Sequence, residues 1–457
     1  MKINRLMIAA PKSGSGKTIM TCALLQIFKD MGQKVISFKC GPDYIDPMFH
    51  RKVIGIPSKN LDTFFTGEEK TKKIFAKSAG KADIAVLEGV MGLFDGLSGV
   101  REEGSSYHLA KVTKTPVILV VDAKGMGRSV IPLISGFLAY DREHLIKGVI
   151  LNRMSKGYYE MIRPLIEKEL DIAVVGYFPD KRQCQIESRH LGLKMPDEME
   201  DIKGKLKEVS EEIQMTVSIE QIMEIAKAAA DLSCEEVLDE NSKKIPTEDA
   251  PVIAVAKDEA FCFFYEDNLR LLQEYGAKIA YFSPIHDQAL PYGCSGILLV
   301  GGYPELYAAE LSNNTAMRED IRKKIEQGMP VVAECGGFMY LHKAIRTQDG
   351  HSYPMVGAIL ADCYDTGKLV RFGYIEILES GNHFLGKGER IRGHEFHYYD
   401  SEQNGHDCTA IKPVTGRNYP CVIAGKDHWM GFPHLYYPSN PLFAKRFVEK
   451  TIEYRQK

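Results

Sequence analysis

The chain has 457 residues, 44% of them hydrophobic, and its formal net charge is −3 at pH 7. This length exceeds what a single hydrophobic core usually holds, so we expect two domains of ordinary size. Acidic and basic residues are interspersed, which argues against nucleic acid or a membrane surface as a partner and leaves a small-molecule enzyme as the default class.

Targeting and redox features indicate a cytoplasmic protein. Residues 1–6 lead directly into the first expected strand without a signal segment, and no apolar run approaches the roughly 20 residues that span a bilayer. The 10 cysteines form no Cys-x-x-Cys pair and have no regular spacing. We therefore expect reduced thiols rather than a disulfide framework or a zinc site.

The stretch 5–18 is an apolar strand that runs into a glycine-rich loop ending in Lys17 and Thr18, and then into a helix. This order is typical of a phosphate-binding loop, in which backbone N–H groups and the lysine hold phosphates and the threonine ligates Mg²⁺. Pro11 stands where the common pattern has glycine, so the loop is a variant. The predicted nucleotide-binding residues here are Lys12, Gly14, Ser15, Gly16, Lys17 and Thr18.

Lys12 has two interpretations. A lysine five residues before the loop lysine resembles the signature lysine of partitioning-type ATPases, which often act across a dimer interface. Alternatively, Lys12 is an ordinary solvated lysine. The first interpretation would make the protein a homodimer.

Beyond the loop, residues 17–31 have apolar residues at helical spacing and stop at Gly32, an expected left-handed cap. Short apolar runs then alternate with helix-length segments, which predicts a doubly wound α/β domain with a parallel sheet. The polar, aperiodic stretch 233–250 is expected to be a linker between domains 1–232 and 251–457. The further strands predicted in the first domain are 34–39, 83–88, 117–122, 148–152 and 173–177.

Carboxylates follow two of these strands. Glu88 ends an apolar run, where an acid would hold Mg²⁺ or its water beside the phosphate loop. Asp43 and Asp46 come after the second strand, at the edge where open α/β sheets bind ligands, although turn chemistry alone could explain them. Asp95 lies on a glycine-rich loop that could fold over the phosphates, or it is an ordinary turn aspartate.

The α/β pattern restarts with a strand at 252–255, a helix at 266–275 and strands at 278–282 and 296–300. Region 351–419 alternates short strand-like pieces with turns.

Cys335 lies where a buried strand runs into a helix, which predicts a nucleophile elbow. Such a turn would expose the thiol, and the helix N-terminus would lower its pKa and offer N–H donors to an oxyanion. By itself, a cysteine at a strand end is more often structural. Gly301 and Gly302 follow the preceding strand as a glycine turn able to aim a backbone N–H at the same oxyanion, and His434 is the proposed base.

Taken together, four motifs of the first domain resemble the family of cobyrinate a,c-diamide synthases. These enzymes of corrinoid biosynthesis amidate the a and c acetate side chains of the macrocycle. Related cobyric acid synthases differ after the second strand, and dethiobiotin synthetases share the loop and fold but lack a second domain. The motifs are Phe38-Lys39-Cys40-Gly41-Pro42-Asp43-Tyr44-Ile45-Asp46-Pro47, Asn60-Leu61-Asp62-Thr63, Glu88-Gly89-Val90-Met91-Gly92-Leu93-Phe94-Asp95-Gly96 and Arg189-His190-Leu191-Gly192-Leu193.

The resemblance implies a ligase that uses ATP, L-glutamine and Mg²⁺ on a corrinoid small molecule by way of an acyl phosphate. It implies that Thr18, Asp43 and Glu88 associate with the metal. Asn152, at a late strand end, would lie against adenine, or it is simply a polar strand terminus. Candidates for contact with the substrate or the phosphoryl intermediate are Tyr44, Asp46, Asp95 and His190.

The second domain resembles the glutaminase domain of class I glutamine amidotransferases, a flavodoxin-like α/β fold. The resemblance implies a Cys335/His434 catalytic pair and an oxyanion and glutamine site at Gly301, Gly302 and Gly336. Class I enzymes usually carry a glutamate two residues after the histidine, where this chain has Tyr436, so the group that orients His434 stays open. The motif at 393–398 also matches the family, and its histidines suggest either a metal site or a structural turn.

Two rival functions remain. The same chemistry could act on hydrogenobyrinate or nickel-sirohydrochlorin. A partitioning-type ATPase switch, whose output is partner binding, is suggested only by Lys12.

Overall fold

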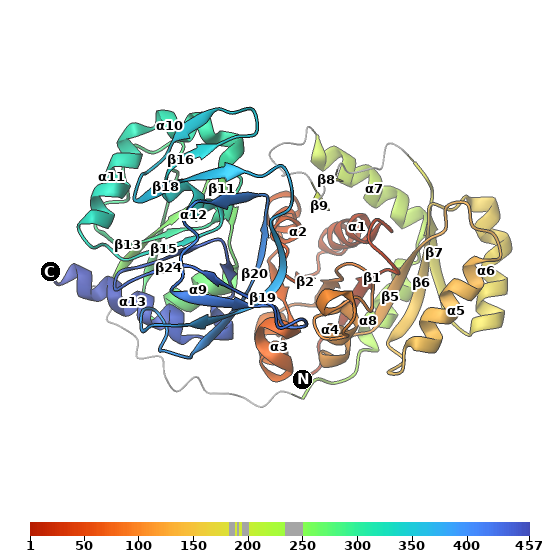
Figure 1. Cartoon of the computed structure of the whole chain (residues 1–457). Coiled ribbons are helices and arrows are strands. Elements are labelled where there is room, and N and C mark those ends of the chain that lie inside the picture. The colour runs from red at the N-terminus through yellow and green to blue at the C-terminus, as the bar shows by residue number, and fades with distance from the viewer. Residues whose placement is uncertain (182–187, 190–191, 194–200, 234–249) are drawn as a thin grey trace. The chain divides into compact units, whose positions relative to one another are not determined.

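The computed structural model describes residues 1–181, 188–189, 192–193, 201–233 and 250–457. The chain folds as two compact units, Met1–Val237 and Leu238–Lys457, both drawn in Figure 1. The linker predicted at 233–250 lies almost wholly outside the described residues, so the domain bounds expected from the sequence stay predictions.

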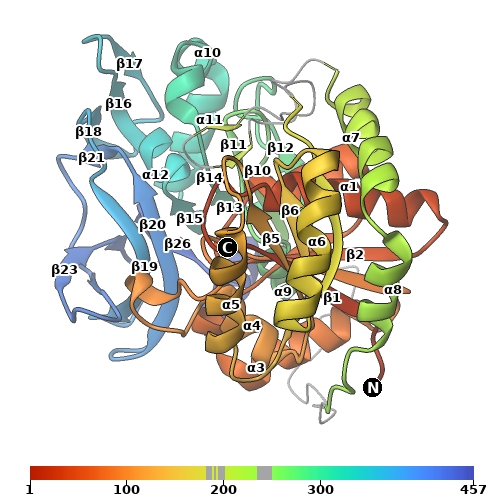
Figure 2. The same ribbon diagram turned by 90° about the vertical axis from the view of Figure 1, so that its right-hand side faces the viewer.

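The first unit is built on a seven-stranded sheet in which every strand pairing is parallel. The strand order is β3-β2-β4-β1-β5-β6-β7, and helices lie on both faces of the sheet (Figures 1 and 2). The strands are β1 (Arg5–Ala9), β2 (Val35–Cys40), β3 (Ser58–Leu61), β4 (Ile84–Glu88), β5 (Val117–Asp122), β6 (Ile146–Asn152) and β7 (Ala173–Phe178). The helices are α1 (Lys17–Asp30), α2 (Ile45–Phe49), α3 (Thr63–Ala79), α4 (Ser106–Val112), α5 (Val130–Tyr140), α6 (Lys156–Leu170), α7 (Ile202–Thr216) and α8 (Ile219–Lys227).

The buried strands explain why the parallel sheet could be predicted. Every residue of β1, β2 and β4 is buried, as expected for strands covered by helices on both faces. The doubly wound α/β architecture is confirmed, and Gly32 has the expected left-handed backbone, with φ 78°. Strand β3 was not predicted, because the sequence Ser-Lys-Asn-Leu carries no apolar run.

The register of the sheet brings three strand ends together. Glu88, the last residue of β4, pairs with Lys39 on one side and with Ile8 of β1 on the other. The loops that follow β1, β2 and β4 therefore leave the sheet at the same edge. This is the carboxyl edge at which open α/β sheets bind ligands.

The start of the first unit is tied to its end. The amino group of Met1 donates to the carbonyl of Leu232 at 3.0 Å, and the Leu232 N–H donates back to the Met1 carbonyl at 3.1 Å. Arg5 is fully buried at the start of β1. Its guanidinium donates to the backbone carbonyls of Ile3, Thr113, Lys114 and Ala230.

The second unit contains a six-stranded sheet with the order β12-β10-β13-β15-β25-β24. Its first five strands are parallel and, numbered along the chain, follow the order 2-1-3-4-5 of flavodoxin-like folds, while β24 pairs antiparallel with β25. The strands are β10 (Val252–Ala256), β12 (Lys278–Phe282), β13 (Cys294–Leu299), β15 (Val331–Glu334), β24 (Ile423–Ala424) and β25 (His428–Gly431). The helices of this unit are α9 (Glu266–Glu274), α10 (Ala308–Asn313), α11 (Thr315–Glu326), α12 (Gly336–Leu341) and α13 (Leu442–Arg455).

Smaller sheets extend this unit, and they confirm the strand-like pieces expected at 351–419. Strands β17, β16, β18 and β21 form one sheet, strands β23, β22, β19, β20 and β26 form another, and β11 pairs with β14. Their bounds are β11 (Phe261–Phe263), β14 (Gly301–Gly302), β16 (His342–Arg346), β17 (Ser352–Pro354), β18 (Ile359–Asp365), β19 (Arg371–Glu379), β20 (Arg390–His397), β21 (Tyr399–Ser401), β22 (Cys408–Ile411), β23 (Asn418–Cys421) and β26 (His434–Leu435). Among the described residues, no helix has the length and apolar character needed to cross a membrane.

Candidate active site

The loop between β1 and α1 has the backbone of a phosphate cradle. Gly14 and Gly16 adopt left-handed φ angles of 76° and 94°, which glycine reaches at little cost. Gly16 lies directly before α1, so the free N–H groups of the first helical turn open toward the loop. These groups and the positive helix end are suited to bind phosphate oxygens.

Lys17 is buried beside this loop. Its Nζ donates to the Met91 carbonyl at 2.7 Å and approaches the Lys12 carbonyl at 3.4 Å. Burial, with a contribution from the nearby charge of Lys39, lowers the pKa of Lys17 to about 8. The ammonium is thus held by neutral carbonyls, and the charged oxygens of a phosphate would be stronger acceptors for it.

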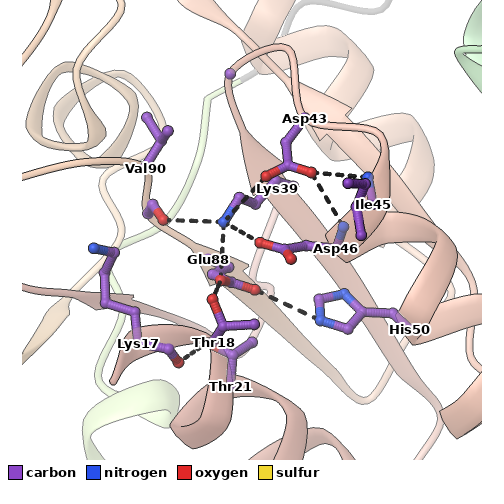
Figure 3. A network of polar contacts seen from close by, with 12 residues as sticks. Lys17, Thr18, Thr21, Lys39, Asp43, Ile45, Asp46, His50, Glu88 and Val90 are labelled. Carbon is purple, nitrogen blue, oxygen red and sulfur yellow. Dashed lines mark hydrogen bonds and ion pairs between the residues drawn. The ribbon is translucent and has the colours of Figure 1, made fainter. Parts of the chain in front are cut away.

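Figure 3 shows the centre of the site, where Lys39 lies among three carboxylates. Its Nζ is 2.6 Å from Asp46 Oδ2, 2.9 Å from Glu88 Oε1 and 3.9 Å from Asp43 Oδ2. Thr18 Oγ1 donates to the same Glu88 oxygen at 2.7 Å. The structure therefore joins the end of β2, the end of β4 and the first turn of α1 through one ammonium and one carboxylate.

The charges in this cluster shift each other's protonation. Burial alone would lower the pKa of Lys39, but the negative charges of Asp46 and Glu88 outweigh burial and raise it. Burial raises the pKa of Glu88 above its ordinary value. His50, whose Nε2 is 3.6 Å from Glu88 Oε2, has a pKa lowered to about 3 by burial and is neutral.

The oxygen donors of this cluster suit Mg²⁺. Glu88 Oε2 and Asp46 Oδ1 are buried oxygens with no hydrogen-bond donor among the described residues. Mg²⁺ commonly takes one or two carboxylates together with a hydroxyl, waters and substrate phosphates. Thr18 and Glu88 provide such a set beside the phosphate loop. No group of three His, Cys, Asp or Glu side chains in the described part of the chain is arranged to hold a metal by itself.

Asp43 has a second use. Its Oδ1 accepts the N–H groups of Ile45 and Asp46 at 2.9 and 3.1 Å, so it caps the short helix α2. Asn60 Nδ2 donates to the Asp43 carbonyl at 2.6 Å and fixes the same turn. The turn explanation considered for Asp43 is thus correct, and only its other oxygen faces Lys39.

The remaining predicted residues of the first unit gather around the loop. Asp95 Oδ2 accepts the Gly92 N–H at 2.9 Å and so fixes the turn between them, while Tyr44 is buried directly before α2. Lys12 is exposed, and Ser15 Oγ donates to its carbonyl at 3.0 Å. His190 lies outside the described residues.

Asn152, at the end of β6, contacts the phosphate loop. Its Nδ2 donates to the Ser15 carbonyl at 2.8 Å, and a Cβ on Gly16 would lie 2.3 Å from that nitrogen. The amide hydrogens expected to recognise adenine are therefore engaged at least partly in bracing the loop.

In the second unit, Cys335 forms the expected elbow between β15 and α12. Its backbone has φ 46° and ψ −106°, a strained combination for a residue with a side chain. Gly336 follows at a crowded position, because a Cβ there would lie 2.8 Å from Pro304 Cδ and 3.0 Å from the Gly302 nitrogen. The Gly302 N–H thus lies beside the elbow, where an oxyanion donor is needed.

His434, on β26, reaches the same place. A Cβ on Gly301 would lie 2.3 Å from His434 Cε1, so the imidazole packs directly on the glycine backbone. Gly301 and Gly302 are not a free turn as expected. They form the short strand β14, paired antiparallel with β11, which fixes their backbone.

The predicted exposure of Cys335 is wrong, and burial outweighs the pKa-lowering effect of the Gly336 N–H at the start of the helix. The thiol is buried rather than exposed, with 6% of the residue accessible, and α12 has only six residues. Burial, reinforced by the charge of Glu305, raises the pKa of Cys335 far above its ordinary value. Burial also lowers the pKa of His434 to about 3, so at neutral pH both groups are uncharged.

Most of the motif at 393–398 is a strand and not a turn, because residues 393–397 lie in β20 and only Tyr398 forms the bend before β21. His394 pairs with His434 of β26, and their rings stack at 4.9 Å between centroids with 14° between planes. His394 Nδ1 lies 3.2 Å from the Tyr265 hydroxyl. His397 instead stacks on Phe432 at 4.1 Å, so these histidines do not converge on a metal.

Two residues with clear positions in the first site, Lys39 and His50, were given no role from the sequence, and His394 was given two interpretations without a link to His434. Lys39 had a usable signal, because a lysine inside the otherwise apolar run of β2 must find a charged partner when buried. His50 had none, and the motif that contains His394 did not indicate its partner, because these contacts depend on packing between separate segments.

Two protein-family models match the chain. Residues 6–193 match the CobQ/CobB/MinD/ParA nucleotide binding domain, and residues 252–428 match the CobB/CobQ-like glutamine amidotransferase domain. Each matched range lies within one of the two compact units.

The chain is also similar over nearly its whole length to curated cobyrinate a,c-diamide synthases. It is 39% identical to the protein of Caldanaerobacter subterraneus subsp. tengcongensis over 455 residues, which cover 99% of each chain. It is 37% identical to that of Thermoplasma volcanium, covering 100% of this chain and 99% of the relative. With the protein of Listeria innocua the identity is 40% over 87% of each chain.

Proposed function

Because this chain belongs to the family of cobyrinate a,c-diamide synthases, amidating ligases with a nucleotide-binding and a glutamine amidotransferase domain, we propose that it amidates the a and c acetates of cobyrinate. ATP and L-glutamine are the co-substrates. We assign ATP binding to residues 1–232 and ammonia production to residues 251–457.

In the first unit, a carboxylate oxygen of the substrate attacks the γ-phosphorus of ATP, and the bond to the ADP oxygen breaks. The loop N–H groups and Lys17 hold the phosphates during this transfer. Thr18 and Glu88, which are joined by a hydrogen bond, would hold Mg²⁺, and the ion would supply charge stabilisation at the phosphate oxygens. Ammonia then attacks the acyl carbon and inorganic phosphate leaves, which gives the amide.

In the second unit, Cys335 sulfur attacks the glutamine carboxamide carbon. The thiol proton moves to His434, which passes it to the leaving nitrogen, and water later releases glutamate from the thioester. Because both groups are neutral before glutamine binds, the thiolate forms only as the attack proceeds. The N–H groups of Gly302 and Gly336 receive the oxyanion.

The observation that carries this proposal is the strained Cys335 elbow beside Gly302 and His434. A nucleotide-dependent switch that acts through partner binding has no use for a buried nucleophile in a second unit. The corrinoid substrate and the amide product follow from the family, and the elbow supplies the nitrogen that this reaction needs.

The test is incubation of the pure protein with ATP, Mg²⁺, glutamine and one of three macrocycles: cobyrinate, hydrogenobyrinate or nickel-sirohydrochlorin. Mass spectrometry counts the amide groups added. We expect two additions to cobyrinate and none by the Cys335→Ser variant with glutamine. Faster amidation of either other macrocycle would identify that macrocycle as the substrate. Absence of both glutamine hydrolysis and amidation with all three would favour a nucleotide-dependent switch that acts through partner binding.

A further inference from the structure

Lys39 is the most completely enclosed cation of the first site. Only 4% of the residue is accessible, and its Nζ lies 2.6 Å from Asp46, 2.9 Å from Glu88 and 3.4 Å from the Gly89 carbonyl (Figure 3). Its backbone is fixed within β2, between β3 and β4, so the ammonium is delivered to one place by the sheet. The ammonium of a surface lysine could move away into solvent, but the ammonium of Lys39 is confined by burial.

Glu88 is the carboxylate that the ammonium shares with the expected metal site. Its Oε1 accepts both Lys39 Nζ, at 2.9 Å, and Thr18 Oγ1, at 2.7 Å. Thr18 is also the hydroxyl expected to ligate Mg²⁺. The ammonium and the Thr18 hydroxyl therefore share one oxygen of the carboxylate that is expected to hold the metal.

The buried carboxyl groups favour a cation at this place. Glu88 and Asp46 are fully or almost fully buried, and two carboxylates at such short range repel strongly when water is excluded. Lys39 places one positive charge between the two carboxyl groups. A free Mg²⁺ ion would have to approach a positive charge and share carboxylates that are already paired.

We propose that Lys39 is an internal counter-ion that occupies the place of the divalent cation when no nucleotide is bound. The site would then not bind the free metal ion and would bind it only together with the nucleotide. The phosphates of the nucleotide add negative charge, so the Lys39 ammonium and the divalent cation can both remain in the site. This rests on the metal site of the proposed function, but it concerns loading of the site and not amidation.

The experiment measures binding of Mn²⁺, a paramagnetic substitute for Mg²⁺, to the full chain without nucleotide, glutamine or corrinoid. Electron paramagnetic resonance counts the free ion. Wild type should bind no Mn²⁺ tightly, whereas Lys39→Met should gain one site, with affinity raised about tenfold or more because a buried positive charge has been removed. Thermal unfolding should agree, since millimolar MgCl₂ alone should raise the Tm of Lys39→Met and leave that of wild type unchanged.

Two further variants locate the ion and separate charge from packing. Lys39→Met combined with Glu88→Gln should lose the gained site, because it removes the shared carboxylate. Lys34→Met, which removes an exposed lysine directly before β2, should behave as wild type. Retention of the Mn²⁺ site in the double variant would place the ion elsewhere and overturn the proposal.

Other outcomes are equally decisive. Tight Mn²⁺ binding by nucleotide-free wild type would overturn the proposal, as would equal affinity of wild type and a folded Lys39→Met protein. If Lys39→Met is insoluble when expressed, refolding with and without millimolar MgCl₂ replaces the binding experiment. Recovery only with the cation supports the counter-ion role, and failure under both conditions overturns it. Because no amidation is measured, an error in the assigned substrate does not affect the result.

Discussion

The two sites of this protein hold their buried functional groups by different interactions. In the first unit, the Lys39 ammonium is buried between the carboxyl groups of Asp46 and Glu88, and charged contacts hold the cluster together. In the second unit, Cys335 and His434 are uncharged, and the reactive group is prepared by a strained backbone and close packing on glycine. One site is held by electrostatics and the other by steric fit.

The difference teaches which perturbations each site should tolerate. A charge-compensated site fails when one partner loses its charge, because the other charges remain buried and unbalanced. A site held by packing fails when a single carbon is added to a contact surface. The following experiments use this distinction, from the largest expected effect to the smallest.

Cys335→Ser should abolish synthesis with glutamine and leave synthesis with added ammonium salts, because the nucleophile is needed only for ammonia release. Amide formation measured with both nitrogen sources gives the answer. A folded variant that loses both activities would show that the two sites do not act as separable halves.

Glu88→Gln should reduce synthesis on the order of 100-fold or more with either nitrogen source, because it removes a charge that the phosphoryl-transfer site needs. The rate with saturating ammonium is the measurement, and glutamine hydrolysis by the same sample shows that the second unit is intact. Wild-type turnover with ammonium would remove Glu88 from the site.

Gly301→Ala should disturb only the second site, because the added methyl would lie 2.3 Å from His434 Cε1 and push the imidazole aside. We expect glutamine-dependent synthesis to fall about 10- to 100-fold, within the range for misplacement of a catalytic group. Gly125→Ala, in an open loop of the first unit where the added methyl would meet no atom within 4 Å, is a matched control, although the stability of both variants must be checked since φ at Gly125 is positive. Unchanged glutamine use by Gly301→Ala would mean that His434 has room to adjust.

The smallest effect is expected for thiol alkylation. Because the pKa of Cys335 is raised and that of His434 is lowered, Cys335 is a neutral thiol at neutral pH. Alkylation of Cys335 should therefore be slow near pH 7, rise with pH as the thiol ionises, and change only a few-fold in His434→Ala. Peptide mass mapping must identify Cys335, and fast alkylation at pH 7 that His434→Ala abolishes would show a preformed ion pair instead.

The sequence predicts the first unit well, because its parallel strands are buried apolar runs and its phosphate loop is a local motif. It also places Asp43, Asp46 and Glu88 at strand ends, which the sheet register gathers as expected. It gave no role to Lys39, although the lysine stands inside a motif used to recognise the family. The role of Lys39 depends on β4 lying beside β2, and this strand order cannot be read from the β2 segment alone.

The second site was harder to predict. The elbow is local and was predicted, but the protonation state of its thiol depends on burial by segments far along the chain. This burial outweighs the pKa-lowering effect of the helix N–H group. The stacking of His394 on His434 depends on the register between β20 and β26. No residue pattern within β20 or β26 alone predicts that these two histidines stack.

The bonds between Met1 and Leu232 give the first unit adjacent ends, which bears on how the protein can be dissected. A fragment that stops before Ala230 would deprive buried Arg5 of one of its four carbonyl partners, whereas a cut after Leu232 keeps them all. Adjacent ends also make this unit a candidate for circular permutation, with a short connection from Leu232 to Met1 and new ends in a surface loop. In such a protein the phosphate loop would no longer lie close to the N-terminus, and the surrounding sheet would be unchanged.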